Sequence, residues 1–313
     1  MVRFLRPVLF VCGILTLLMA GLMLAVACFA WLRQDPEMEV FLISFGITLG
    51  CGLVLVLGCH DRGFHLVARQ LYLLTSLSWV LMSLFGALPL FFSHFQLSAE
   101  DAVFEAVSGI TTTGSTILSG IEHLAPSLLL WRSLLQWLGG LGVIGMAVSI
   151  LPFLRVGGMR LFHTESSDWS EKSIPRVQSL ARLLVLTYLT LSVCCVLSYW
   201  LAGMTLFDAV NHAMATVSTG GFATDDRSMG RFSLGVLWVS ILFMILSALP
   251  FTLLIGFFRR PSMDLFRNQQ VLGFFAIIVV VSLLLTADLI DLQVFAPFEA
   301  FTQASFNLVS VIT

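Results

Sequence analysis

Charged residues are scarce in this 313-residue chain: they make up 11%, against about 25% in ordinary soluble domains. Hydrophobic residues make up 58%, and the mean hydropathy is +0.98. A chain with so few charges does not fold as a soluble globular domain. The composition indicates a polytopic membrane protein.

Cysteine is also sparse, and its placement argues against a disulfide framework or a cysteine metal site. All six cysteines lie in apolar runs, which is typical of packed or lipid-facing thiols. The six histidines show no metal-ligand spacing. His212 stands alone on a short apolar segment, where a packed or hydrogen-bonded role is expected. We therefore expect no cofactor in this chain.

Long apolar runs are what the chain has in abundance. A membrane-crossing helix needs about 20 apolar residues, and seven runs qualify as full spans. Residues 25–27 fit a signal-peptidase pattern, but the first apolar run continues past that site and is expected to be retained. The predicted spans are residues 8–31, 40–59, 71–92, 126–153, 181–202, 232–257 and 269–289.

The few charges are sorted by sign along the chain. Arginines and the lysine gather at alternate ends of the spans, which the positive-inside rule assigns to the cytoplasm. Most acidic residues lie at the opposite ends, outside, where a surplus of negative charge raises the local concentration of cations.

Three segments repeat one another. Residues 101–111 read DAVFEAVSGIT, residues 303–313 read QASFNLVSVIT, and residues 208–218 read DAVNHAMATVS. Gly221 follows Asp208 by the same number of residues as Gly114 follows Asp101. Fixed spacing of this kind marks a repeat architecture.

Each repeat predicts a short helix followed by a turn rich in Thr, Ser and Gly. A helix over 100–110 rises about 16 Å, half a bilayer, and the same holds for 207–217. Such a segment is too short to cross a membrane and too apolar to stay in water, so we expect it to re-enter on the same side. The alternative is an ordinary outer loop with polar turn chemistry, which two aligned loops and the start of a third disfavour.

The turns have the chemistry of a cation filter. Backbone carbonyls on an extended turn replace the hydration shell of an alkali cation, and glycine reaches the positive φ values that aim them at one axis. Each short helix would direct its partially negative C-terminus toward the ion. The predicted potassium-binding residues, mainly through backbone carbonyls, are Thr111, Thr112, Thr113, Gly114, Ser218, Thr219, Gly220, Gly221 and Thr313.

Two further groups of charged residues are candidates for the site. Arg132, near the outer end of a span, needs a partner facing the helix bundle. Glu105 is the candidate for structural support of the first short helix, and direct ion handling or surface exposure are the alternatives. Asp225 and Asp226 follow the second turn, where they form either an outer cation vestibule or a solvated acidic turn.

The string Gly140-Leu-Gly-Val-Ile-Gly145 satisfies a dinucleotide-binding pattern but lies inside a predicted span, which favours close helix packing. The longest polar stretch, 155–176, is cytoplasmic by charge and is either a docking surface for a soluble subunit or a solvated linker. No nucleic-acid partner is expected, and membrane lipid surrounds the spans.

The chain resembles the membrane subunits of bacterial Trk-type potassium uptake systems, in the Trk/Ktr/HKT superfamily. The residues that carry the resemblance are FEAVSGITTTGST at 104–116, LLQWLGGLGVIGMAVSILP at 134–152, STGGFAT at 218–224 and FNLVSVIT at 306–313. It implies an all-α polytopic membrane protein with span-pore helix-span repeats around a pseudo-fourfold pore. It also implies a multi-pass protein of the bacterial inner membrane, a homodimer, and a cytosolic nucleotide-binding regulatory subunit similar to TrkA.

The resemblance also implies a division of the chain. The expected parts are an N-terminal two-span extension at 1–64, a first repeat at 65–156, a cytoplasmic linker at 157–180, a second repeat at 181–262 and the start of a third repeat at 263–313. Thr313 aligns with the first filter residue of the first repeat, so we expect these 313 residues alone not to enclose an ion.

Potassium uptake is the leading functional interpretation. A non-conducting fragment or assembly partner is an alternative, and so is a polytopic membrane enzyme using a serine with a histidine, although no such pair recurs with the repeats. The sequence is compatible with a channel and with a coupled symporter, and with K+ alone or K+ together with Na+.

A re-entrant first loop predicts that cysteines introduced at Glu100 and Glu122 both react with a membrane-impermeant reagent from the periplasmic side. The background would have the native cysteines replaced. Labelling of the two positions from opposite sides would rule out the re-entrant model.

Overall fold

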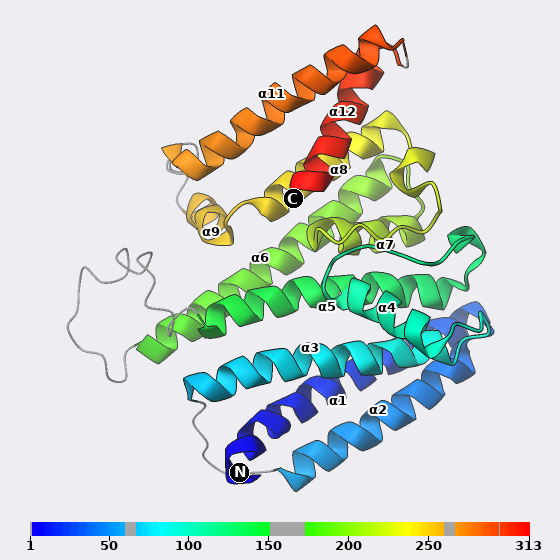
Figure 1. The fold of residues 1–313 in the computed structure, drawn as a ribbon, viewed down its shortest axis with the longest axis vertical. Helices are drawn as coiled ribbons and strands as arrows, with labels where there is room; N and C mark the ends of the chain where they lie inside the picture. Colours follow the sequence, from blue (N-terminus) through cyan, green and yellow to red (C-terminus); the bar gives the residue numbers. More distant parts are fainter. Residues whose placement is uncertain (1, 60–66, 151–172, 260–266, 294) are drawn as a thin grey trace. The chain divides into compact units, whose positions relative to one another are not determined.

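The computed structural model describes residues 2–59, 67–150, 173–259, 267–293 and 295–313. Across these ranges the chain is built from helices and contains no strand (Figure 1). Six of the described helices are long and apolar enough to cross a membrane, which confirms the predicted all-α polytopic class. The chain divides into two compact units, Met1–Ala181 and Arg182–Thr313, and each is described separately.

In its described residues up to Ile150, the first unit is a bundle of four long helices and one short one. α1 and α2 form a hairpin, α3 packs against α1, and the short α4 packs against α3 and α5. The described helices are α1 (Val2–Arg33), α2 (Met38–Gly58), α3 (Ala68–Phe91), α4 (Ala99–Ile110), the 3-10 turn η1 (Ile121–His123) and α5 (Pro126–Ile150).

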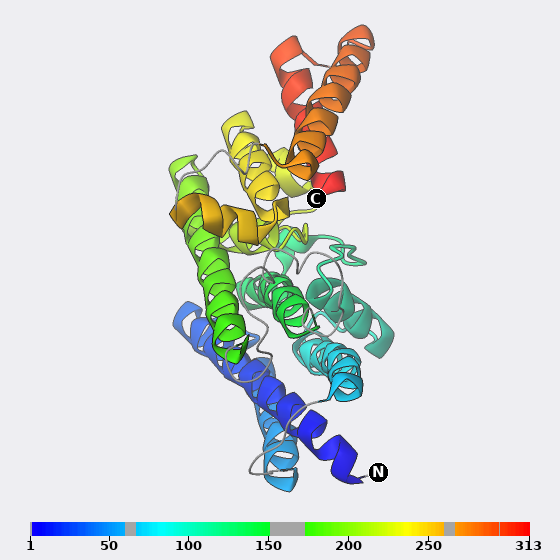
Figure 2. The ribbon, with the colours of Figure 1, turned by 90° about the vertical axis from the view of Figure 1, so that its left-hand side faces the viewer.

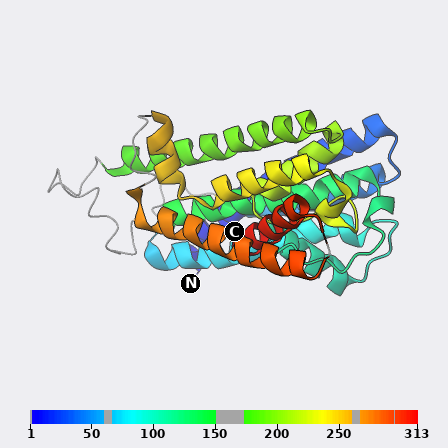
Figure 3. The ribbon, with the colours of Figure 1, turned by 90° about the horizontal axis from the view of Figure 1, so that it is seen from above.

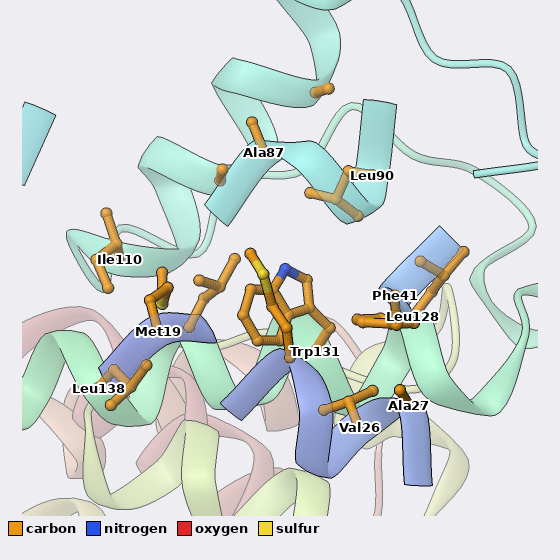
Figure 4. Packing of buried hydrophobic residues seen from close by; sticks show 14 residues of the cluster. Met19, Val26, Ala27, Phe41, Ala87, Leu90, Ile110, Leu128, Trp131 and Leu138 are labelled. Atoms are coloured by element: carbon orange, nitrogen blue, oxygen red, sulfur yellow. The ribbon is translucent and has the colours of Figure 1, made fainter. Parts of the chain in front are cut away.

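Trp131 lies in the middle of the hydrophobic core of this unit (Figure 4). Its side chain is fully buried, and its indole N–H donates to the carbonyl oxygen of Gly86 at 2.9 Å. Its ring meets that of Phe41 edge-on, with 5.8 Å between centroids, a favoured aromatic geometry. The side chains around it come from all five helices, among them Met19, Val26, Ala87, Leu90, Ile110, Leu128 and Leu138. The short helix α4 is therefore part of the same core as the four long helices.

The turn between α1 and α2 is joined to the rest of the unit by two buried carboxylates. Asp35 accepts hydrogen bonds from the N–H groups of Glu37 at 2.9 Å and of Ser127 at 3.0 Å. Because Ser127 lies in the first turn of α5, Asp35 supplies a negative charge where the helix N-terminus favours it. Glu37 in turn accepts from the N–H of His94 at 3.1 Å, just beyond α3.

The second unit repeats the order of long helix, short helix and closing helix seen in α3, α4 and α5. It also contains the beginning of a third copy. α6 leads to a short helix, α7, which packs against α8. α11 and α12 lie side by side, and α12 also packs against α8 (Figure 2). Its described helices are α6 (Ser173–Leu201), which begins before Arg182 in the first unit, α7 (Leu206–Val217), the 3-10 turn η4 (Ser228–Arg231), α8 (Leu234–Ala248), α9 (Phe251–Arg259), α11 (Gln269–Asp291) and α12 (Pro297–Ile312).

The predicted continuous span over 232–257 is wrong. α8 ends at Ala248 after 15 residues, and the chain turns steeply before α9 (Figure 3). Leu249 is extended, with φ −70° and ψ 147°, because the ring of Pro250 excludes the helical conformation from the residue before it. Proline also lacks the N–H that would continue the helix. The 15 residues of α8 rise about 22 Å, which is less than a full crossing.

The hairpin of α1 and α2 depends on Gly13, and a substitution there should destabilise the fold. A Cβ at Gly13 would lie 2.9 Å from Cβ of Leu55 and 3.0 Å from the backbone nitrogen of Val56. Gly13→Val should therefore cost about 1–3 kcal/mol through overpacking, measured as a lower thermal midpoint in detergent. Gly46→Val on α2, where no atom lies within 4 Å of the added Cβ, is the matched control. Equal midpoints for the two variants would contradict the close crossing.

Candidate functional site

The candidate site begins at the two twelve-residue helices, α4 and α7, which start in the same way. The hydroxyl of Ser98 accepts a hydrogen bond from the N–H of Asp101 at 3.1 Å, and that of Thr205 accepts from the N–H of Asp208 at 3.1 Å. These are N-caps, and the acidic side chains in both first turns add a favourable charge. The bounds of the two helices agree with the short helices predicted at 100–110 and 207–217.

The first filter turn, Thr111 to Gly114, leaves α4 through a Schellman motif. The N–H of Thr112 donates to the carbonyl of Gly109 at 3.0 Å, and the N–H of Thr113 donates to that of Ser108 at 2.9 Å. Thr112 is left-handed, with φ 55°, and so is Gly114, with φ 78°. A left-handed threonine is uncommon and costs energy, so the surrounding contacts must hold it there.

The second filter turn, Ser218 to Gly221, has the same backbone. The N–H of Thr219 donates to Thr216 at 3.1 Å, and the N–H of Gly220 donates to Ala215 at 2.8 Å. Thr219 has φ 53° and Gly221 has φ 86°. Thus a threonine and a glycine, two residues apart, are left-handed in both turns.

The third copy reaches the first residue of the same motif. The N–H of Thr313 donates to Val309 at 3.1 Å, as that of Thr111 does to Val107 at 2.9 Å. The hydroxyls of both threonines also donate to the same two carbonyls, at 2.8 and 2.7 Å. α12 begins at Pro297, six residues before the repeat recognised in the sequence at 303.

This backbone directs carbonyl oxygens away from each short helix. In a planar trans peptide the C=O points opposite to the N–H of the next residue. Since the N–H groups of Thr112 and Thr113 point back into α4, the carbonyls of Thr111 and Thr112 point forward, and Ser218 and Thr219 repeat this in the second turn. The result is a set of carbonyl oxygens beyond the partially negative C-terminus of a helix, which suits a cation without a full negative charge.

The structure brings Arg132 and Glu105 together. The guanidinium of Arg132, on α5, donates through Nε and Nη2 to Oε1 of Glu105, both at 2.8 Å. The two side chains are only 1% and 0% exposed. Thr116, two residues after Gly114, donates to Glu105 at 2.9 Å and accepts from Arg132 at 3.2 Å. The network thus joins α4, α5 and the segment that follows the first filter turn.

A different network occupies the corresponding place in the second repeat. The hydroxyl of Thr224, three residues after Gly221, donates to Oδ1 of Asp208 at 2.8 Å, and Nε2 of His212 lies 3.3 Å from the same hydroxyl. His212 is buried and hydrogen-bonded, as the sequence predicted. The contacts of Thr116, Thr224 and Asp208 were missed. Their signal in the sequence was a threonine two or three residues past each filter glycine.

Asp225 is buried and engaged with two arginines. Its Oδ1 accepts from the N–H of Arg227 at 2.9 Å, and its Oδ2 lies 3.4 Å from Nη1 of Arg231. The hydrogen bond from the Arg227 backbone, assisted by the two guanidinium groups, holds the pKa of Asp225 below its usual range. Arg231 also lies 3.9 Å from Asp208, so the loop after the filter turn is tied to the start of α7. A vestibule formed by Asp225 and Asp226 stays a prediction.

The remaining sequence candidates do not form a second site. Gly140, Gly142 and Gly145 lie within the helix α5, which lacks the strand and loop that a dinucleotide site needs. In the described ranges, no three His, Cys, Asp or Glu side chains gather to hold a metal ion. The segment 155–172 lies outside the described residues.

Comparisons with known proteins give a consistent result. The sequence model of the TrkH family, described as cation transport proteins, matches residues 37–303. The Trk system potassium uptake protein TrkI of Halomonas elongata is 44% identical over 309 residues, or 98% of this chain and 63% of that protein. The Trk system potassium uptake protein TrkH of Vibrio parahaemolyticus is 34% identical over 98% of this chain and 65% of that protein.

A solved structure is similar as well. The crystal structure of the potassium transporter TrkH from Vibrio parahaemolyticus matches with a TM-score of 0.88 at 33% identity, over 98% of this chain and 64% of that one. The chain thus spans a little under two thirds of the length of these relatives.

Removal of one charge from the buried pair should destabilise the protein far more than removal of an exposed one. Glu105→Gln leaves Arg132 buried without its counter-charge, a change worth about 3–5 kcal/mol. Thermal midpoints in detergent should fall accordingly, whereas Glu122→Gln, at an exposed carboxylate, should change little. The double variant Glu105→Leu with Arg132→Leu should recover much of the loss. If the double variant loses as much stability as Glu105→Leu and Arg132→Leu lose together when measured singly, the coupling of the pair would be contradicted.

Proposed function

The chain belongs to the TrkH family of cation transport proteins, and we propose that it is a potassium-translocating subunit of a Trk-type uptake system. The observation that carries the proposal is the recurrence of one unusual backbone at Thr112–Gly114 and Thr219–Gly221. Two left-handed residues in the same register, one of them a threonine, point to selection for carbonyl direction. An ordinary outer loop does not require this recurring backbone.

The carbonyl oxygens of the filter turns are proposed to bind K+ in place of its hydration water. The proposed ligands are those predicted from the sequence, Thr111 to Gly114, Ser218 to Gly221 and Thr313. The C-termini of α4, α7 and α12 add partial negative charge at these turns. Such neutral oxygens hold a weakly hydrated cation and release it again, which transport requires.

We propose that the side chains next to the turns support the turn backbone and do not themselves bind K+. Glu105 and Arg132 are neutral as a pair and contact Thr116, so they are suited to hold the exit of the first turn in place. The carboxylate of Asp225 is paired with Arg227 and Arg231, which reduces its contribution to any attraction of cations at the outer mouth.

The proposal extends to location and partners. The apolar helices and the charge distribution support a multi-pass protein, and we place it in the bacterial inner membrane. A homodimer and a cytosolic nucleotide-binding subunit similar to TrkA are the proposed partners. The names of the relatives, as components of Trk systems, support a multi-subunit assembly.

Replacement of Gly221 should reduce ion selectivity without disturbing packing. No atom lies within 4 Å of a Cβ at this position, yet φ is +86°, so a side chain is penalised by backbone conformation alone. In the full-length protein, Gly221→Ser should lower the ratio of K+ to Na+ uptake about tenfold at normal membrane abundance.

The matched control is Gly230→Ser in the same loop, where a Cβ also meets open space and φ is not positive. Uptake of both ions would be measured in a bacterium without its own potassium uptake systems. An unchanged ratio in a normally abundant Gly221→Ser protein would remove Gly221 from the filter.

A further inference from the structure

We propose that Gly139, on α5, is a positioning residue for the first filter turn. Its lack of a side chain lets the backbone of α5 close on the carbonyl group of Ile110, the last residue of α4, and so fixes the direction in which the turn begins. This inference rests on the proposed function and names a further determinant of selectivity at the same turn.

The contact is between backbones and leaves no room for a methyl group. A Cβ at Gly139 would overlap the carbonyl oxygen of Ile110, and would lie 2.8 Å from its carbonyl carbon and 3.1 Å from Cγ2 of Thr112. Neither of the first two atoms belongs to a flexible side chain. Ile110 is itself fully buried in the core, near Met19 and Leu138 (Figure 4). An added methyl group would therefore have to displace backbone.

The peptide group that would move is the one that enters the filter. The N–H of Thr111 is bonded to Val107, so the carbonyl of Ile110 on the same peptide plane points forward, out of α4 and against Gly139. A rotation of this plane changes the torsions of Ile110 and Thr111, and with them the aim of every carbonyl that follows.

α4 cannot simply move away as a whole. Its middle is held to α5 through Glu105 and Arg132, which are completely buried or nearly so. The displacement is therefore concentrated at the C-terminal end, where the left-handed Thr112 already costs energy.

One face of α5 holds the first filter turn at both ends. Arg132, Gln136 and Gly139 are spaced four and three residues apart, which places them on one side of a helix. Arg132 and Gln136 are 1% and 0% exposed. Arg132 reaches Thr116, after the turn, and Gly139 meets Ile110, before it. The distance between these two ends is thus set by a single helix.

Gly142 and Gly145, also on α5, do not share this role, and they provide controls. A Cβ at Gly142 would make only ordinary contacts with the ring of Trp79, at 3.7 and 3.8 Å, and one at Gly145 would meet no atom within 4 Å. The intrinsic effect of replacing a helical glycine with alanine is the same at these three positions. Of the three, only at Gly139 does the added atom meet the backbone at the start of the filter turn.

The test compares Gly139→Ala with Gly142→Ala and Gly145→Ala in the full-length protein, in a bacterium without its own potassium uptake systems. The readouts are the KM and maximal rate of K+ uptake, the ratio of K+ to Na+ uptake, and the abundance of each variant in the membrane. Gly139→Ala should lower the K+ to Na+ ratio about tenfold and raise the KM for K+, because misplaced carbonyls weaken ion binding. Gly139→Ser should fall at least as far, and the two controls should stay within about twofold of wild type.

Each outcome decides the matter. A normally abundant Gly139→Ala protein with the selectivity of the controls overturns the positioning role. If Gly139→Ala alone fails to accumulate, the contact serves folding, and the positioning role is again overturned. Absence of K+ uptake by the wild-type protein would refute the proposed function itself, and this inference with it.

Discussion

A peptide chain that turns inside a membrane has to pair its own N–H groups, because no water is available to do so. The filter turns meet this constraint and gain a function from it. The first three N–H groups of each turn donate back to the helix before it, as Thr113 does to Ser108 and Gly220 does to Ala215. The planar peptide then sends the carbonyls the other way. The hydrogen bonds that end the helix thus create the oxygen atoms that we propose bind the ion.

The two complete repeats share this backbone but not the side chains that support it. At equivalent positions of the two short helices stand Glu105 and His212. The first forms a buried ion pair with Arg132, while the second shares the hydroxyl of Thr224 with Asp208. The backbone geometry recurs, as the proposed binding of a cation by its carbonyl oxygens requires. The supporting contacts need only be well satisfied, so each repeat has its own.

This difference decides what could be predicted from the sequence. The short helices and their turns follow from local signals, such as the helix length, the polar caps Ser98 and Thr205, and the glycines that follow. Hydropathy located the spans, but it does not register the break at Pro250, because proline sits within an apolar run without altering its average. The proline itself was a readable signal that the prediction passed over.

Contacts between helices were harder to infer. Glu105 was identified as a candidate partner of Arg132 because a buried charge demands one, and the structure pairs them. The hydrogen bond between Thr224 and Asp208 could not be predicted in this way. Neither residue requires a buried partner, since both are also common in solvated loops. The closeness of Gly139 to Ile110 depends on how two helices cross, which a string of glycines suggests but does not locate.

The closing helices of the two repeats, α5 and α8, support the short helices α4 and α7 differently. α5 contacts the chain before the first filter turn through Gly139 and after it through Arg132. α8 stops at Ala248, and its contribution passes through Ser240, which accepts from the hydroxyl of Tyr199 at 2.8 Å. That hydroxyl lies 2.7 Å from Thr216 on α7. The short helix α7 is therefore held by side-chain hydrogen bonds from α6 and α8. The short helix α4 is held by a backbone contact and a buried ion pair with α5.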